Sequence, residues 1–233
     1  IGKRSIIGNN VRVFGEGRLE IGNHVKIHNN VTLCVKGKAI INDCAWIGQD
    51  SFIDATGDLI INRFSVLGIG STICTHVRGG DKLFGCRYEE DCSATLGEDS
   101  WLMTKASIGP YKLGSKSVAL MGAVITKDFG DNRILGGVPA KDLTNKMGHP
   151  YITKTGEEIK NGFERLIQKY KKIKQINTKI EFGEDLNQWS GKGSFYDLKE
   201  RICHTYISEE EVELNKWLFG FRAKFSMYYH DID

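Results

Sequence analysis

The sequence predicts an all-β solenoid of triangular coils, followed by a small α/β region. Aliphatic residues recur with spacings of six, six and eight, at Ile21, Ile27, Leu33, Ile41, Ile47, Ile53, Ile61, Leu67 and Ile73. A spacing of six excludes an α-helix, whose faces recur every 3.6 residues, and fits short strands joined by corners. Glycines repeat with the same twenty-residue period, at Gly17, Gly37 and Gly57. Three strands per coil then form a prism with the aliphatic columns inside.

The coils follow one another along most of the first 147 residues. The pattern extends backward to three further aliphatic positions, and it returns after one break. These positions are Ile1, Ile7 and Val13 before the repeat, and Leu96, Leu102, Ile108, Leu113, Ala119 and Ile125 after it. The repeat therefore predicts about six coils. The segment 136–141 leaves the pattern and ends the prism, so we expect one domain over residues 1–147 and a C-terminal extension over 148–233.

Polar residues near the corners are expected to accept a left-handed backbone, which Asn, Asp and Gly tolerate best. They are Asn23, Asn29, Asn42, Asp43, Asp50, Asn62 and Gly70.

The repeat breaks once, next to a histidine. A fourth corner glycine is due at position 77, but the residue there is Val77, and it follows His76. The aliphatic pattern then resumes fifteen residues late, at Leu96. The sequence therefore predicts a loop extruded from the coil beside His76.

The C-terminal region changes to helical spacing. Thr155-x-x-Glu158 is a capping box that opens one helix, and Ser208-x-x-Glu211 opens a second. Ile176, Thr178, Ile180 and Phe182 alternate as in a strand between them. We expect a small α/β appendage.

Composition excludes several classes. A net charge of +3 over 233 residues is too small to indicate a nucleic-acid or membrane-surface protein. Six cysteines without paired metal spacing are expected to be reduced thiols, which favours a cytoplasmic protein. No apolar run or signal peptide predicts membrane insertion. Because Ile1 is already in phase, a native N-terminus is expected to be missing.

Three motifs carry a resemblance to a known family: Leu96–Leu102, Val124–Asp128 and Gly136–Lys141. Together with the hexapeptides they resemble the hexapeptide-repeat acyltransferases, and within them the galactoside, maltose and capsular or O-antigen polysaccharide O-acetyltransferases. The resemblance covers about residues 1–147 and implies a left-handed parallel β-helix. It also implies transfer of an acetyl group from acetyl-coenzyme A to a sugar hydroxyl, without a metal.

His76 is the candidate catalytic residue. Acyl transfer to a hydroxyl needs a base, and a histidine can supply one near neutral pH. In the family the catalytic histidine precedes a loop and the Trp motif, as His76 precedes Trp101. The group that orients the imidazole stays open among Asp81, Asp91, Glu98 and a backbone carbonyl. The other histidines (His24, His28, His149, His204 and His230) are expected on the surface.

The resemblance also implies the remaining site residues. For acetyl-coenzyme A they are Trp101, Thr104, Met121, Gly122, Thr126, Lys127 and Lys141. The acceptor is expected to meet Asp81, Arg87 and Tyr88 of the loop and Tyr111 of the next coil. Leu120-Met121-Gly122-Ala123 departs from the Gly-Ala-Gly-Ser corner usual in the family, and Met103 stands where glycine is common; both changes narrow the space beside the groove.

Three other functions compete with this hypothesis. A zinc carbonic anhydrase of the same fold needs three convergent histidines, and His24 and His28 lie more than two coils from His76. A non-catalytic structural β-helix would not require His76 or the loop. N-acetylation of an amino sugar would use the same donor.

A homotrimer is expected, with active sites between subunits. The family packs in this way. The flat faces of the prism are also expected to expose large apolar residues that threefold packing would cover. The candidates are Val13, Phe14, Trp46, Phe52 and Phe64.

Overall fold

The structure is a computed structural model, and it describes residues 1–87, 89–91, 93–175, 180–191, 193–205, 209–220 and 222–230. The chain divides into two compact units, Ile1–Ile152 and Thr153–Asp233. Each unit is described by itself.

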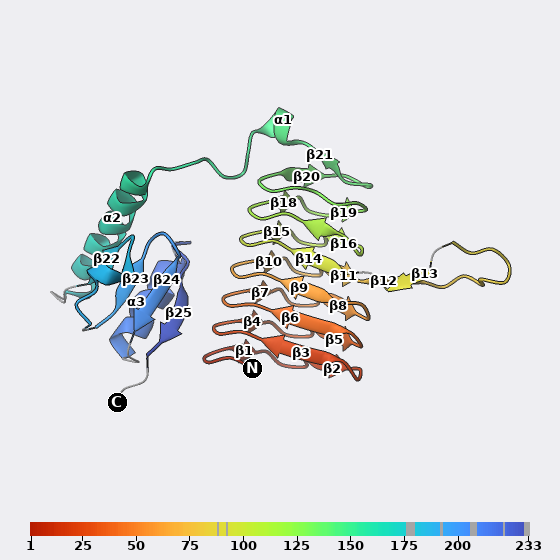
Figure 1. Ribbon diagram of the computed structural model, residues 1–233, viewed down its shortest axis with the longest axis horizontal. Coiled ribbons are helices and arrows are strands. Elements are labelled where there is room, and N and C mark those ends of the chain that lie inside the picture. Colours follow the sequence, from red (N-terminus) through yellow and green to blue (C-terminus); the bar gives the residue numbers. More distant parts are fainter. Residues whose placement is uncertain are drawn as a thin grey trace. The chain divides into compact units, whose positions relative to one another are not determined.

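The first unit is a stack of coils whose strands form three sheets (Figure 1). Sheet A contains, in spatial order, β1 (Ile6–Ile7), β4 (Lys26–Ile27), β7 (Trp46–Ile47), β10 (Val66–Leu67), β15 (Trp101–Leu102), β18 (Val118–Ala119), β20 (Ile134–Gly136) and β21 (Lys141–Asp142). Sheet B contains β2 (Arg12–Phe14), β5 (Thr32–Val35), β8 (Phe52–Ala55), β11 (Thr72–Cys74), β16 (Ser107–Ile108) and β19 (Val124–Ile125). Sheet C contains β3 (Arg18–Ile21), β6 (Lys38–Ile41), β9 (Leu59–Ile61), β14 (Ala94–Leu96) and β17 (Lys112–Leu113).

As far as Cys74 the pairing follows the twenty-residue period, and beyond it the interval is 35 residues across the hairpin and then 17 and 16. Neighbouring strands run parallel except β20 and β21, and Ile27 pairs with Ile47, which pairs with Leu67. These side chains are fully buried in the axial core, together with the other aliphatic columns. In the first coil described, Ile7 and Val13 occupy the same columns but are 44% and 54% exposed. The core therefore forms only where one coil covers the next.

The corners use Asn and Asp differently from the expectation. Of the residues named for a left-handed backbone, only Asp50 and Gly70 have positive φ; elsewhere the conformation falls one or two residues later, as at His24 after Asn23 and at Phe64 after Asn62. The polar side chain instead bonds to the neighbouring coil, as when the Asn23 backbone N–H donates to Asp43 Oδ1 at 2.7 Å. This contact satisfies a backbone group that no strand partner reaches.

Large apolar residues on the prism faces agree only in part with the expectation. Val13, Phe14 and Phe52 are exposed, and Trp46 is half-buried. Phe64 is completely buried, because it occupies a left-handed corner with its ring beneath the Arg63 guanidinium, so it is not a surface candidate.

The break in the repeat is an antiparallel hairpin of β12 (His76–Arg78) and β13 (Glu89–Asp91), which projects from the stack in Figure 1. The short helix α1 (Thr144–Met147) follows β21.

The second unit is a four-stranded sheet with two helices. The elements are α2 (Gly156–Lys174), β22 (Glu181–Gly183), the 3-10 helix η1 (Leu186–Gln188), β23 (Phe195–Asp197), β24 (Ile202–Thr205), α3 (Glu209–Gly220) and β25 (Ser226–Tyr229). Thr155 and Glu158 form the predicted capping box. Phe163, Ile167 and Tyr170 of α2 join the core of this unit. Ser208 and the predicted strand residues Ile176 and Thr178 lie outside the described residues.

Within the described parts of the chain, no helix has the length and apolar character needed to cross a membrane.

Close contact between coils makes Gly68 sensitive to substitution. A Cβ at Gly68 would lie 2.4 Å from the Thr104 backbone nitrogen, whereas one at Gly130 would meet no atom within 4 Å. We expect Gly68→Ala to lower the stability of the solenoid unit by about 1–3 kcal/mol, as overpacking does. Gly130→Ala is the matched control and should leave stability unchanged or slightly raised. Thermal unfolding followed by circular dichroism checks this, and equal midpoints for the two variants would contradict the close stacking.

Candidate active site

His76 lies where the chain leaves the solenoid. β11 ends at Cys74, and β12 begins at His76 as the first residue of the hairpin. The prism continues unchanged beyond the hairpin, because Ile73 still pairs with Ile108 in the next coil. The insertion therefore sets His76 at the base of an extruded loop without disturbing the core below it.

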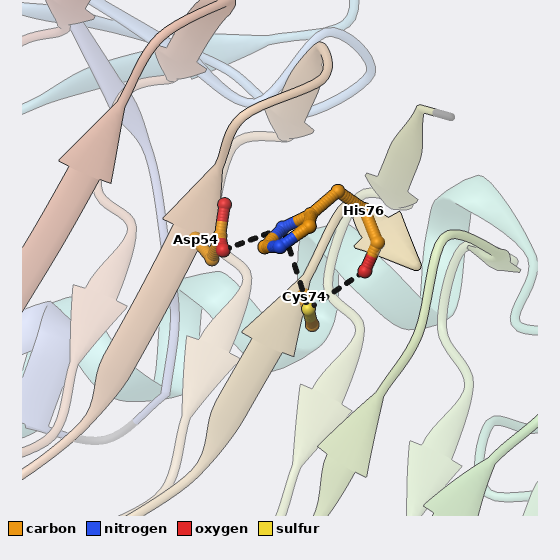
Figure 2. A group of neighbouring side chains, drawn as sticks. All are labelled: Asp54, Cys74 and His76. Carbon is orange, nitrogen blue, oxygen red and sulfur yellow. Dashed lines mark hydrogen bonds and ion pairs between the residues drawn. The ribbon is translucent and has the colours of Figure 1, made fainter. Parts of the chain in front are cut away.

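Asp54 orients the imidazole. It lies in the coil below, opposite Cys74 in the parallel pairing of β8 and β11. Its Oδ2 is 2.7 Å from His76 Nδ1, and its side chain is 7% exposed against 30% for His76. Its other oxygen, Oδ1, accepts a hydrogen bond from the Thr56 backbone N–H at 2.8 Å. Figure 2 shows the carboxylate facing the ring.

Cys74 completes the group. Its Sγ lies 3.9 Å from His76 Nδ1, and it donates to the His76 carbonyl oxygen at 3.1 Å. Asp54 and Cys74 come from two adjacent coils, and both side chains lie close to Nδ1 of His76 (Figure 2).

This geometry fixes the chemistry of the imidazole. A carboxylate only accepts hydrogen bonds, so the short contact assigns the ring hydrogen to Nδ1 and leaves the lone pair on Nε2. A buried carboxylate also stabilises a positive charge on the ring. The pair can therefore take up a proton at Nε2.

Asp54 is not among the carboxylates that the sequence suggests as orienting groups. Of those, Asp81 accepts at Oδ1 from the Leu83 N–H, and Glu98 pairs with Arg63 at 2.8 Å. Asp91 pairs with His76 through the strands, but its side chain is not among those described. The signal was available, because position 54 is one period before Cys74.

The residues expected to bind coenzyme A fall into three places. Thr104, Met121 and Gly122 lie at successive corners between sheets A and B, where the Gly122 N–H donates to the Thr104 carbonyl at 3.1 Å. Thr126 and Lys127 follow β19 at the corner between sheets B and C, the corner that His76 occupies lower in the stack. Both are exposed, with the Lys127 ammonium 5.4 Å from the Phe129 ring.

The other two coenzyme candidates lie on sheet A. Trp101 begins β15 beside Val66, with 42% of its surface exposed. Lys141 lies in the terminal strand β21 and is also exposed. The predicted set thus occupies the last coils of the prism, but it does not follow a single edge within one chain.

The acceptor candidates are more dispersed. Asp81 and Arg87 are exposed on the hairpin, and Tyr88 lies outside the described residues. Tyr111 is half-buried and packs against the axial core from the corner before β17. Leu83 and Phe84 at the hairpin tip are almost fully exposed.

The expectation that the remaining histidines lie on the surface is wrong for His204. This residue is buried in the second unit, with its Nδ1 3.3 Å from His230 Nε2. Burial, and next the nearby His230, lower the pKa of His204, while Asp197 opposes the shift. His28 is half-buried against Trp46, and burial and Lys26 lower its pKa. Cys34 and Cys74 are free thiols, Cys34 buried and Cys74 partly exposed.

The curated proteins that match the chain in sequence include the following two. A protein of Escherichia coli K12 named colanic acid biosynthesis acetyltransferase WcaF is 26% identical over 139 residues, which are 59% of this chain and 73% of that protein. A protein of Schizosaccharomyces pombe named serine acetyltransferase is 29% identical over 106 residues, or 44% of this chain and 37% of that protein. No family model matches the chain.

One solved structure shares the fold over most of the chain. It is a mutant of AntD, an N-acyltransferase from Bacillus cereus, in complex with dTDP and coenzyme A. The region that the two structures share covers 72% of this chain and 90% of the AntD chain, with a TM-score of 0.53 and 16% sequence identity. The resemblance to the hexapeptide-repeat acyltransferases is confirmed. The left-handed parallel β-helix is confirmed with it, as is the prediction of an acyltransferase.

The hydrogen bond to Asp54 predicts the tautomer of His76. In the wild-type protein, nitrogen NMR of the neutral His76 ring should show the hydrogen on Nδ1. In Asp54→Ala this acceptor is lost, and we expect a mixture richer in the Nε2–H form, which is the more stable one in free histidine. An unchanged tautomer in the variant would show that Asp54 does not orient the ring.

Proposed function

We propose that the protein transfers an acetyl group from acetyl-coenzyme A to a hydroxyl of a sugar or surface-polysaccharide precursor, with His76 as general base. The observation that carries the proposal is the 2.7 Å contact between the buried Asp54 carboxylate and His76 Nδ1. A non-catalytic solenoid has no need for an oriented imidazole at the base of an extruded hairpin. We assign the reaction to residues 1–147 and treat 148–233 as an accessory extension.

The proposed reaction uses the His76 tautomer that carries its hydrogen on Nδ1 and a lone pair on Nε2. Nε2 takes the proton of the acceptor hydroxyl as its oxygen attacks the thioester carbonyl carbon, and a new C–O bond forms. The imidazolium is stabilised by Asp54 while the tetrahedral intermediate exists. When the C–S bond breaks, the imidazolium returns the proton to the coenzyme A thiolate. Bond making and proton transfer therefore use one histidine and no other titrating side chain.

The donor site is proposed from the residues of the last coils. Lys127 and Lys141 present exposed ammonium groups that suit the phosphates of coenzyme A. Thr104, Met121 and Gly122 line one corner column, where the Met121 side chain is 74% exposed. Trp101 offers an exposed ring for the thin pantetheine arm or the adenine. The AntD structure, which contains coenzyme A, is consistent with this donor.

The acceptor class rests on two supports. The Escherichia coli relative is named for colanic acid biosynthesis, and colanic acid is a polysaccharide. On this chain, Asp81 and Arg87 of the hairpin offer groups that hydrogen-bond to sugars. AntD is an N-acyltransferase, so an amino-sugar acceptor is the alternative that an assay must include. The expectation of a cytoplasmic protein stays a prediction.

Removing the base should reduce turnover. We expect His76→Ala to lower kcat by about 10²–10⁴, the usual contribution of a positioned base. Asp54→Asn should also lower kcat strongly, because the amide can hold the ring in the wrong tautomer. Coenzyme A release is measured with panels of sugars, amino sugars and oligosaccharides. His149→Ala is the matched control, since His149 is exposed and bonds to the Asn132 carbonyl. Wild-type turnover in His76→Ala would refute the assignment.

We further propose that the protein is a homotrimer and that sheet B packs between subunits. Phe14 and Phe52 are exposed on strands β2 and β8 of this sheet, in columns two residues apart. Threefold packing would cover both rings and bring coenzyme residues of one subunit toward His76 of another. This would explain why the coenzyme candidates do not share one edge within the chain.

Light scattering after size exclusion tests the trimer. We expect about three times the chain mass of 26.1 kDa. Phe52→Asp should dissociate the trimer, because it places a charge in the apolar interface. Ile60→Asp is the control on sheet C, where Ile60 is 39% exposed against 41% for Phe52. A fully active monomer would contradict the shared site.

A further inference from the structure

The group of Asp54, Cys74 and His76 has the geometry of a metal site. One ligand atom from each residue, a carboxylate oxygen, Sγ and a ring nitrogen, lies within 4.8 Å of the other two. It is the one group of this kind found among the residues that the structure describes. The atoms belong to adjacent coils held by parallel pairing, so the site exists before any ion binds.

The donor set selects the class of metal. A thiolate, an imidazole and a carboxylate together suit Zn²⁺, which takes three protein ligands and leaves a fourth position to water. Zinc bonds of about 2.0–2.3 Å in a tetrahedron place ligand atoms roughly 3.3–3.6 Å apart. To reach these separations, the Nδ1–Oδ2 distance would increase from 2.7 Å and the Sγ–Nδ1 distance would decrease from 3.9 Å. Rotation about one side-chain bond produces changes of this size. His76 and Cys74 are partly exposed, which gives an ion access.

Zinc at this site would change the histidine that the proposed reaction uses. The ion takes the Nδ1 lone pair, so the hydrogen of the neutral ring moves to Nε2, and the Cys74 thiol releases its proton to solvent. Nε2 then carries a hydrogen and cannot accept one from a hydroxyl. Asp54 at the same time exchanges its contact with the ring for the metal.

We propose that Asp54, Cys74 and His76 bind one Zn²⁺ ion, and that the bound ion reversibly inhibits the enzyme by fixing His76 as the Nε2–H tautomer. The binding follows from the three ligand atoms alone. The inhibition rests on the proposed function, because it requires His76 to be the base. Cys74 has no part in acetyl transfer and acts only as the soft ligand that gives the site its zinc preference.

The experiment measures zinc binding separately from activity. The full chain is stripped with EDTA, exchanged into buffer and titrated with ZnCl₂ against a chromophoric chelator. We expect one site that Cys74→Ser weakens by more than tenfold, because a thiolate ligand is lost. Cys86→Ser is the matched control, since Cys86 lies on the hairpin outside the group. Co²⁺ in place of zinc should give a thiolate charge-transfer band that disappears in Cys74→Ser and persists in Cys86→Ser.

The outcomes separate the two parts of the proposal. Equal zinc affinity in the wild type, Cys74→Ser and Cys86→Ser would overturn the site, whatever the activity of the protein. With an acceptor in hand, the wild type should lose activity as the site fills and recover it with EDTA, while Cys74→Ser keeps its own zinc-free rate. Zinc bound through Cys74 without loss of activity would overturn the inhibition. Absence of transfer with every acceptor would count against the proposed function and leave the binding result standing.

Discussion

Parallel stacking in register with a fixed period is the constraint on which the first unit depends. As far as Cys74, each paired residue lies twenty residues from its partner, so residues at the same phase of the repeat stack in one column. Ile27, Ile47 and Leu67 illustrate this in the core. Backbone hydrogen bonds hold the register, and the buried aliphatic columns make any shift costly, since a one-residue slip would move them to the surface.

The candidate site is a consequence of the same register. Phe14, Cys34, Asp54 and Cys74 form one column of sheet B, and only one member is a carboxylate. A buried carboxylate is costly unless hydrogen bonds satisfy it. Here the Thr56 N–H serves one oxygen and the His76 ring serves the other. The hairpin makes this possible, because it lets the chain leave the coil at His76 and turn the ring back toward the coil below.

Much of the fold could be predicted from the period, and less of the site. The repeat identifies the core columns and the break at His76, because burial depends directly on spacing. It could not show that Phe64 is buried, since a corner residue lies outside the aliphatic columns and its direction depends on local backbone. Nor could it show that His204 is buried in the second unit, where no repeat constrains the packing.

The role of Asp54 could be predicted from the sequence, whereas the spatial arrangement of the coenzyme candidates could not. Subtracting one period from Cys74 gives Asp54, whereas the candidates Asp81, Asp91 and Glu98 lie further along the chain, in or beside the hairpin. Trp101, Thr104 and Lys127 were identified by resemblance rather than by period. Their separation, with Trp101 on a strand of sheet A and Thr104 and Lys127 at two different corners, is a property of the three-dimensional winding, which similarity of short motifs cannot reveal.

The central claim is that Asp54 and His76 act as one unit in acetyl transfer. The most direct test compares the single-turnover rate of acetyl transfer in the wild type, Asp54→Asn, His76→Ala and the double variant. If Asp54 acts only through the imidazole, adding Asp54→Asn to His76→Ala should cause no further loss of rate. Losses that multiply in the double variant would show that the two residues act independently, and would contradict this account.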